Sequence, residues 1–151
     1  MLTPDITKKK ILDNYLIITT VNKNYLKIFD IWYHFFCKCE YASILRVITL
    51  DKKSEKYISG KSIETICPGK YSEDFHDIIQ WRFEEIYKAL KAGKNIIQSD
   101  ADAFWLKPKI ADIVNEKYDL QSSIGYGIPT EAVNKWGFSL CTGFMVLQSN
   151  Q

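Results

Sequence analysis

Asp100 and Asp102 are the residues whose types and spacing most clearly suggest chemistry. They stand one residue apart in the run SDADAFWLKP, and in an extended chain two such carboxylates point the same way and can share one hard cation. Magnesium or manganese held by so few ligands keeps coordination positions for diphosphate oxygens. We therefore predict that Asp100 and Asp102 bind a divalent cation, manganese or magnesium. The alternative is a solvated loop in which the aspartates cap the following turn.

Arg82 is the second candidate for a role in binding. A helix is expected from about Glu73 to Ala92, and a helical wheel places Arg82 between Ile78 and Ile86, inside the apolar arc. A guanidinium cannot lose its proton there and must find an anion. We expect Arg82 to reach a bound diphosphate or an aspartate of the Asp100 to Asp102 loop. A snorkelling side chain, or a structural pair with a buried carboxylate, is the alternative.

Other residues with functional side chains give weaker signals. Gly143 is expected at the lip of the final strand, where backbone could approach a sugar closely, although such a glycine is more often a bulge. His34 and His76 are read as structural or surface residues. Trp136, expected in a loop, could stack on a sugar face.

The first half of the chain predicts a strand, a helix and a second strand. Tyr15 to Thr20 is a short β-branched run, and Asn22 suits the N-cap of the helix that follows. The apolar side of that helix recurs at three- and four-residue steps, and Ile44 to Leu50 forms the second strand. This order is typical of parallel strands joined by a crossover helix. The expected apolar positions of the helix are Tyr25, Ile28, Phe29, Trp32, Phe35 and Phe36.

The second half predicts the elements that hold the aspartates. Residues 52–72 are polar and are expected to form a short helix and an irregular connection. The helix near 73–92 would be capped by Ser72, and its expected apolar set is Phe75, Ile78, Ile79, Phe83, Ile86 and Leu90. The remaining expected elements are a strand at Asn95 to Gln98, a short helix near Ile110 to Asn115, a strand near Asp119 to Ile124 and a last strand near Phe144 to Leu147. The fold class is therefore α/β, an open, mostly parallel, Rossmann-like sheet flanked by helices, which binds ligands at the carboxyl ends of its strands.

Composition restricts the function classes. The chain has 151 residues, which fits one domain, and 46% hydrophobic residues are enough for a packed core. A formal charge of +2 with dispersed lysines does not indicate nucleic acid as a partner. We expect no membrane span and no signal peptide, hence a soluble cytoplasmic protein. The cysteines Cys37, Cys39, Cys67 and Cys141 are interpreted as free thiols, because Cys-x-Cys without a second close pair has poor zinc spacing.

Two longer motifs resemble a known family. WRFEEIYKALKAGKNIIQSDADAFWLKP, followed at a distance by LCTGFMVLQSN, resembles the nucleotide-diphospho-sugar transferases, DxD-containing glycosyltransferases of the glycosyltransferase-A fold. The resemblance covers roughly Tyr15 to Gln148. It implies a metal-dependent enzyme that transfers a sugar from a nucleoside-diphosphate sugar donor to an unknown glycan, protein or lipid acceptor.

The same resemblance implies roles for individual residues. Asp102 would ligate the metal, and Asp100 would contact the metal or the donor ribose. Cys141 stands where the family usually has asparagine. The other positions implied to contact the donor are Thr19, Thr20 and Asn22 beside the nucleotide, Arg82 near the donor, and Thr142 and Gly143 beside the transferred sugar.

The resemblance also implies that residues 1–151 form a single nucleotide-sugar-binding domain that is incomplete at its C-terminus. Phe144 to Leu147 is apolar on both faces, so we expect something else to cover it, and we expect self-association and poor transferase activity of the chain alone. Two other interpretations remain open. DADAF could be the acidic motif of an aspartate-nucleophile phosphatase, or the chain could be a truncated, non-catalytic remnant that binds a nucleotide sugar.

Overall fold

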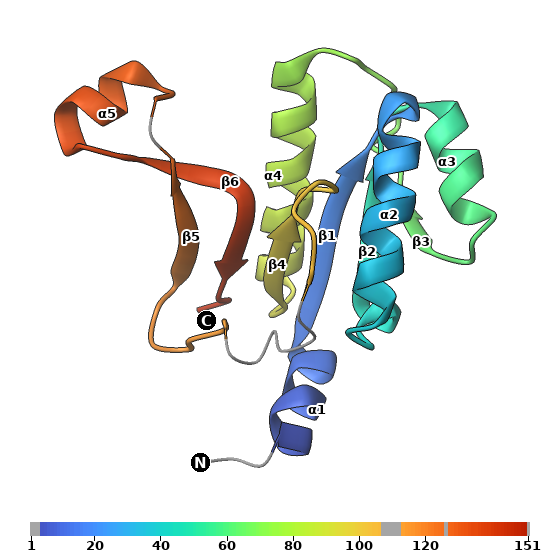
Figure 1. The fold of residues 1–151 in the computed structure, drawn as a ribbon, viewed down its shortest axis with the longest axis horizontal. Coiled ribbons are helices and arrows are strands. Elements are labelled where there is room, and N and C mark those ends of the chain that lie inside the picture. Colours follow the sequence, from blue (N-terminus) through green and yellow to red (C-terminus); the bar gives the residue numbers. More distant parts are fainter. Residues whose placement is uncertain (1–3, 107–112, 126, 151) are drawn as a thin grey trace.

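The protein is a six-stranded sheet flanked by helices on both faces (Figure 1). The computed structural model describes residues 4–106, 113–125 and 127–150. The strand order is β3-β2-β1-β4-β6-β5, and the α/β fold predicted from the sequence is confirmed. Neighbours from β3 to β4 are parallel, whereas β6 pairs antiparallel with both β4 and β5. The strands are β1 (Tyr15–Val21), β2 (Leu45–Thr49), β3 (Glu64–Ile66), β4 (Asn95–Ser99), β5 (Leu120–Gly125) and β6 (Ser139–Leu147).

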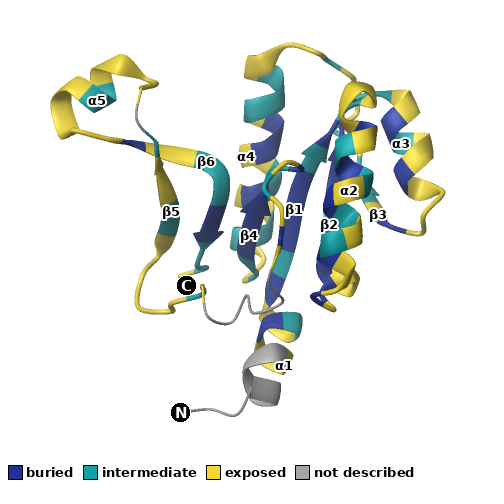
Figure 2. Cartoon of the chain, viewed as in Figure 1, coloured by how far each residue is buried: buried dark blue, intermediate teal, exposed yellow. Residues whose placement is uncertain are grey.

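The helices bury two separate cores against the sheet. One core joins α2 and α3 to the face of β1 that carries Ile17, and the other joins α4 to the face that carries Ile18. Because both faces of the central strands are covered, these strands are buried along most of their length (Figure 2), and their sequences are mainly apolar. No helix in the described ranges is long and apolar enough to cross a bilayer. The helices are α1 (Pro4–Asn14), α2 (Leu26–Cys37), α3 (Lys52–Ser59), α4 (Phe75–Lys91) and α5 (Thr130–Trp136).

The start of each of the two long helices is set by a polar side chain. Asn22 acts as a cap, as predicted, although it caps the short 3-10 turn Lys23–Tyr25 that leads into α2. The prediction that Ser72 caps the second long helix, α4, is wrong. Asp74 caps α4 instead, because its carboxylate accepts hydrogen bonds from the backbone N–H groups of His76 and Asp77.

Several helices and strands were not predicted from the sequence. β3 is too short to show alternation, and it lies where only an irregular connection was expected. α1 and α5 were not predicted, and Trp136, expected in a loop, is the last residue of α5. Of the helix predicted at 110–115, residues 110–112 lie outside the described residues, and Ile113 to Asn115 are not helical.

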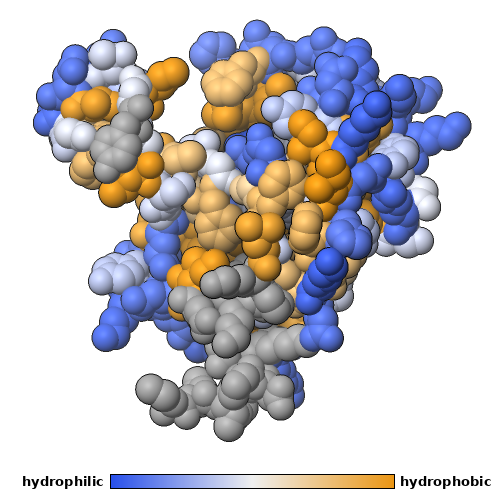
Figure 3. Space-filling model, in the orientation of Figure 1, coloured by the Kyte–Doolittle hydropathy of each residue, from blue (hydrophilic) through white to orange (hydrophobic). Residues whose placement is uncertain are grey.

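The expectation of an uncovered last strand is wrong. β6 is longer than predicted and lies between β4 and β5, so it is not an edge. The chain itself buries Met145 and Val146, and Phe144 and Leu147 pack against the two cores. Exposed apolar side chains gather instead on the arm formed by β5, α5 and the first half of β6 (Figure 3). They include Ile124, Ile128, Trp136, Phe138 and Leu140.

Asp51 ties the end of β2 to the segment that follows β1. Its carboxylate accepts hydrogen bonds from the backbone N–H of Lys53 and of Ser54, both at 2.9 Å, and so caps α3. The same carboxylate accepts a bond of 2.6 Å from the N–H of Lys23. Burial acts to raise the pKa of Asp51, but the hydrogen bonds from Ser54, Lys23 and Lys53 outweigh it and hold that pKa below its ordinary value.

Two indole N–H groups hold the loop that follows β4. Trp105 is buried and donates to the Ser99 hydroxyl at 3.0 Å, while its ring packs edge-on against Phe36. Trp32 on α2 donates to the carbonyl of Ala103 at 3.1 Å. The apolar neighbours Phe104 and Leu106 are both exposed. The loop is therefore fixed mainly by Trp32 and Trp105.

Replacement of Asp51 by alanine should destabilise the fold by about 1–2 kcal/mol, because α3 loses its cap. Asp51→Asn keeps a capping oxygen and should cost less. Since the folded pKa is depressed, the charge-dependent stabilisation is complete at neutral pH and is lost as the pH falls through the folded pKa. Urea unfolding of the three proteins at neutral and acid pH measures both effects. Equal stability of Asp51→Ala and the wild type at neutral pH would contradict this assignment.

Trp105→Phe should lower the free energy of unfolding by about 1–3 kcal/mol, because the Ser99 hydroxyl loses its donor and part of the core is left unfilled. The matched control is Trp136→Phe, at a position that is 63% exposed, which should change stability by less than about 0.5 kcal/mol. Chemical denaturation compares the two variants. If both substitutions lower the free energy of unfolding by the same amount, Trp105 does not hold the loop.

Candidate functional site

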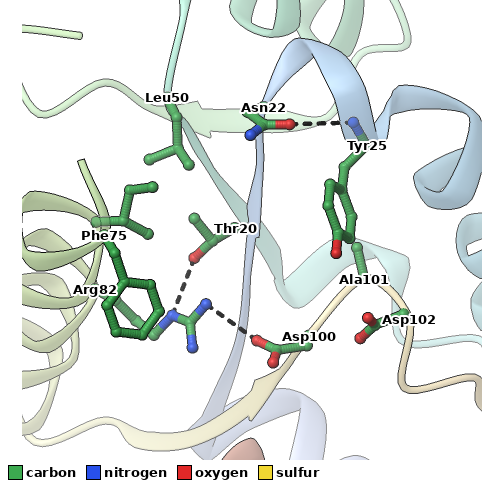
Figure 4. A pocket seen from close by; sticks show the side chains of 10 residues that line it. Thr20, Asn22, Tyr25, Leu50, Phe75, Arg82, Asp100, Ala101 and Asp102 are labelled. Carbon is green, nitrogen blue, oxygen red and sulfur yellow. Dashed lines mark hydrogen bonds and ion pairs between the residues drawn. The ribbon is translucent and has the colours of Figure 1, made fainter. Parts of the chain in front are cut away.

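A pocket opens at the carboxyl ends of β1, β2 and β4, beside the first turns of α4 (Figure 4). The chain runs from β1 outward to β2 and β3, then returns to β4 on the other side of β1. The pocket therefore lies at the point where the strand order reverses, which is where open α/β sheets bind ligands. Its volume is about 210 Å³, and its lining residues are Thr20, Asn22, Tyr25, Leu50, Phe75, Ile78, Arg82, Asp100, Ala101 and Asp102.

Asp100 and Asp102 lie just past the end of β4, as predicted, but the chain is not extended there. The N–H of Ala103 donates to the carbonyl of Asp100 at 3.0 Å, so residues 100–103 form a turn. The N–H of Asp100 donates to the carbonyl of Gly143 on β6 at 2.7 Å, which anchors the start of the turn. Both aspartates line the pocket, although a turn, and not strand geometry, brings them there.

Arg82 points toward the Asp100 loop, which confirms the orientation expected from the helical wheel. Its side chain is buried, with 8% of the residue exposed. One terminal nitrogen, Nη2, lies 3.0 Å from Oδ1 of Asp100, and Nε donates to the Thr20 hydroxyl at 3.3 Å (Figure 4). The guanidinium thus crosses from α4 to the ends of β1 and β4 and neutralises one carboxylate of the pair.

Gln98 is a contact of Asp100 that the sequence interpretation missed. It stands on β4 two residues before Asp100, is fully buried, and donates from Nε2 to Oδ1 of Asp100 at 3.0 Å. Oδ1 therefore receives both Arg82 and Gln98. The available signal was the amide side chain of Gln98, which directly follows Ile96 and Ile97 in a strand expected to be buried. Buried polar groups need partners.

Asp102 differs from Asp100 in having a free carboxylate. It is exposed to the pocket and makes no hydrogen bond or ion pair with any residue in the described part of the chain. Within those residues there is also no group of three His, Cys, Asp or Glu side chains able to hold a metal. Two aspartates alone still fit the usual coordination of magnesium in proteins, in which one or two carboxylates bind the ion and water and phosphate oxygens complete its ligands.

The pocket also has aromatic and apolar walls, which include Leu50 and Ile78. Tyr25 and Phe75 stand on opposite sides of the Arg82–Asp100 contact, Phe75 on the side of α4 and Tyr25 on the side of Ala101 and Asp102 (Figure 4). Phe75 was expected on the buried side of its helix but is 70% exposed. Trp81, which was not in the expected apolar set, is buried on α4. Phe75 shares a helix face with Ile78 and Arg82, but as the first residue of α4 it lines the pocket and is not covered by the sheet.

Three predicted donor contacts do not line this pocket. Thr19 is fully buried on the opposite face of β1 from Thr20, because successive strand residues alternate faces. Thr142 lies on β6 outside the lining. Gly143 is within β6 and not at its lip, in a stretch where the β5–β6 register shifts. A Cβ at Gly143 would lie 3.3 Å from Oδ2 of Asp100, so glycine leaves that oxygen room.

A surface ion pair joins the two segments beside the pocket entrance. Lys23, next to Asn22, lies 2.7 Å from Glu73, two residues before Phe75. The hydrogen bond and charge of Glu73 raise the pKa of Lys23. Both side chains are largely exposed, so solvent screening makes this contact weak compared with the Arg82–Asp100 pair.

Comparison with known proteins adds one finding to this geometry. The model of the nucleotide-diphospho-sugar transferase family matches residues 11–151, which include every residue of the pocket. No curated protein matches the chain. The family match supports the transferase interpretation over the phosphatase interpretation. The chain belongs to the nucleotide-diphospho-sugar transferase family.

Proposed function

We propose that the pocket between β1, β4 and α4 binds a nucleoside-diphosphate sugar with a divalent cation, and that the protein transfers the sugar to an acceptor. The observation that carries this proposal is a pocket that combines charged side chains with exposed aromatic rings. Arg82, Asp100 and Asp102 supply the charges, and Tyr25 and Phe75 supply the rings. A nucleoside diphosphate has matching parts, an anionic diphosphate joined to a flat base.

The charged side chains suit a diphosphate only when a cation is present. Asp102 and Oδ2 of Asp100 would hold magnesium or manganese, and Arg82 would face the diphosphate as a fixed positive charge. Without a cation, two carboxylates would repel the diphosphate more strongly than one guanidinium, already paired with Asp100, attracts it. When bound, the cation would supply neutralisation of the charge that develops on the departing diphosphate.

The aromatic rings of the pocket suit a base and ribose. Tyr25 and Phe75 are 41% and 70% exposed, so each has ring surface that a base could cover. The side-chain oxygen of Asn22 accepts hydrogen bonds from the backbone N–H groups of Asn24 and Tyr25. Its amide N–H₂ is left to face a ligand oxygen at the pocket wall.

Nucleotide-sugar binding without transfer is the second candidate function. Among the described residues that line the pocket, Asp100 and Asp102 are the only acids, and there is no histidine. If both aspartates are occupied with the cation and Arg82, no carboxylate or imidazole of the pocket is left to act as a base. Incubation with a panel of nucleoside-diphosphate sugars and simple sugar acceptors distinguishes transfer from binding by the mass of the products.

Asp102→Asn should weaken the binding of a nucleoside diphosphate in manganese at least about tenfold, because the cation loses its free carboxylate ligand. Calorimetric titration of uridine, guanosine and adenosine diphosphates, with manganese or with a chelator, measures this dependence. Asp13→Asn removes an equally exposed carboxylate far from the pocket and should bind like the wild type. Circular dichroism verifies that both variants are folded. Equal affinity of the wild type in manganese and in chelator would refute metal-dependent binding.

A further inference from the structure

Gln98 is a buried polar side chain that the donor pocket itself does not use. It is fully buried on β4, beside the apolar residue Ile96 and on the same face of the strand. Its Nε2 donates to Asp100, but its Oε1 is buried without a hydrogen-bond partner in the described structure. An amide in this position costs stability, because a buried acceptor has lost its water and gained nothing in return.

The direction of the amide follows from chemistry. A carboxylate accepts hydrogen bonds only, so the N–H₂ side of Gln98 must face Oδ1 of Asp100, and the reverse orientation would set two oxygens against each other. Oδ1 then receives two donors at 3.0 Å, one from Gln98 and one from Arg82. Since the N–H of Asp100 is held by Gly143, both the backbone and the carboxylate of Asp100 have fixed positions.

This arrangement divides the two oxygens of Asp100. Oδ1 is occupied by protein donors, whereas Oδ2 lies beside Gly143, whose missing side chain leaves the oxygen accessible. Without Gln98, one donor would remain on Oδ1, and the carboxylate could rotate toward bidentate contact with Arg82. Rotation would turn Oδ2 toward the guanidinium, where it could no longer serve a cation.

We infer that Gln98 is a positioning residue, which holds Oδ1 of Asp100 so that Oδ2 faces the cation and Arg82 keeps a single-point contact. The inference deepens the proposed function and rests on it for the identity of the ligand. The geometry of Asp100 in the ligand-free protein does not depend on that identity. Gln98 acts only through Asp100 and touches no part of the donor.

Gln98→Met tests this inference, because methionine fills a similar volume and removes only the polar amide. A structural role would make the variant less stable. A positioning role predicts equal or higher thermal stability, since the unpartnered Oε1 disappears, together with a changed contact between Arg82 and Asp100. Gln80→Met is the matched control, because Gln80 is exposed on the same helix as Arg82 and its side chain bonds, among the described residues, to Glu84 alone.

The contact is read in the ligand-free protein by nuclear magnetic resonance of ¹⁵N-labelled arginine. The chain contains two arginines, Arg46 and Arg82, so Arg46→Lys assigns the signals. Gln98→Met should shift the Arg82 guanidinium signals and change its rate of rotation, and Gln80→Met should leave that rate unchanged. In the Asp100→Asn background, Gln98→Met should add no further change. Unaltered Arg82 signals in a folded Gln98→Met protein would overturn the inference.

Ligand binding provides the second readout. In manganese, Gln98→Met should weaken the binding of a nucleoside diphosphate roughly tenfold or more, the loss typical when a support of a metal-binding side chain is removed. Equal binding by a folded Gln98→Met protein and the wild type would also overturn the inference. Failure of the wild type to bind any nucleoside diphosphate would instead refute the proposed function, and the arginine signals would still decide the role of Gln98.

Discussion

The ion pair between Arg82 and Asp100 is the interaction on which the pocket depends. A guanidinium on the buried face of α4 cannot be neutralised by losing its proton, so it requires an anion close by. Asp100 supplies that anion from the end of β4, and the hydroxyl of Thr20 on β1 accepts a further hydrogen bond from Arg82. The same contacts therefore join the helix to two adjacent parallel strands at the point where the strand order reverses.

The rest of the fold fixes the two partners of this pair. Asp74 caps α4, and the packing of Trp81 and Ile86 in the core orients the helix so that Arg82 faces the sheet. On the other side, Trp32 and Trp105 hold the turn after β4 through hydrogen bonds to Ala103 and Ser99. These supports come from both faces of the sheet. A rigid scaffold thus surrounds Asp102, whose carboxylate is left without a protein partner in the described structure and is available to a ligand.

The parts of this arrangement that depend on local patterns could be predicted from the sequence. Apolar runs marked the central strands, and the wheel position of Arg82 placed it against the Asp100 loop. Long-range pairing could not be predicted in the same way. The three residues of β3 carry no periodic signal. β6 was expected to be uncovered because the sequence does not show that it lies between β4 and β5. Gln98 was missed because its importance comes from contact with Asp100, which strand composition alone does not reveal. The exposure of Phe75 was missed because the wheel gives the face of a residue and does not show that the first turn of α4 lines an open pocket.

A crystal of the chain soaked with manganese and a nucleoside diphosphate tests the central claim most directly, since anomalous scattering locates the manganese without reference to any assumed ligand. The account predicts one manganese bound by Asp102 and by Oδ2 of Asp100, with the diphosphate between the ion and Arg82 and the base against Tyr25 or Phe75. Manganese at another site, or a nucleotide bound away from Arg82, would contradict it.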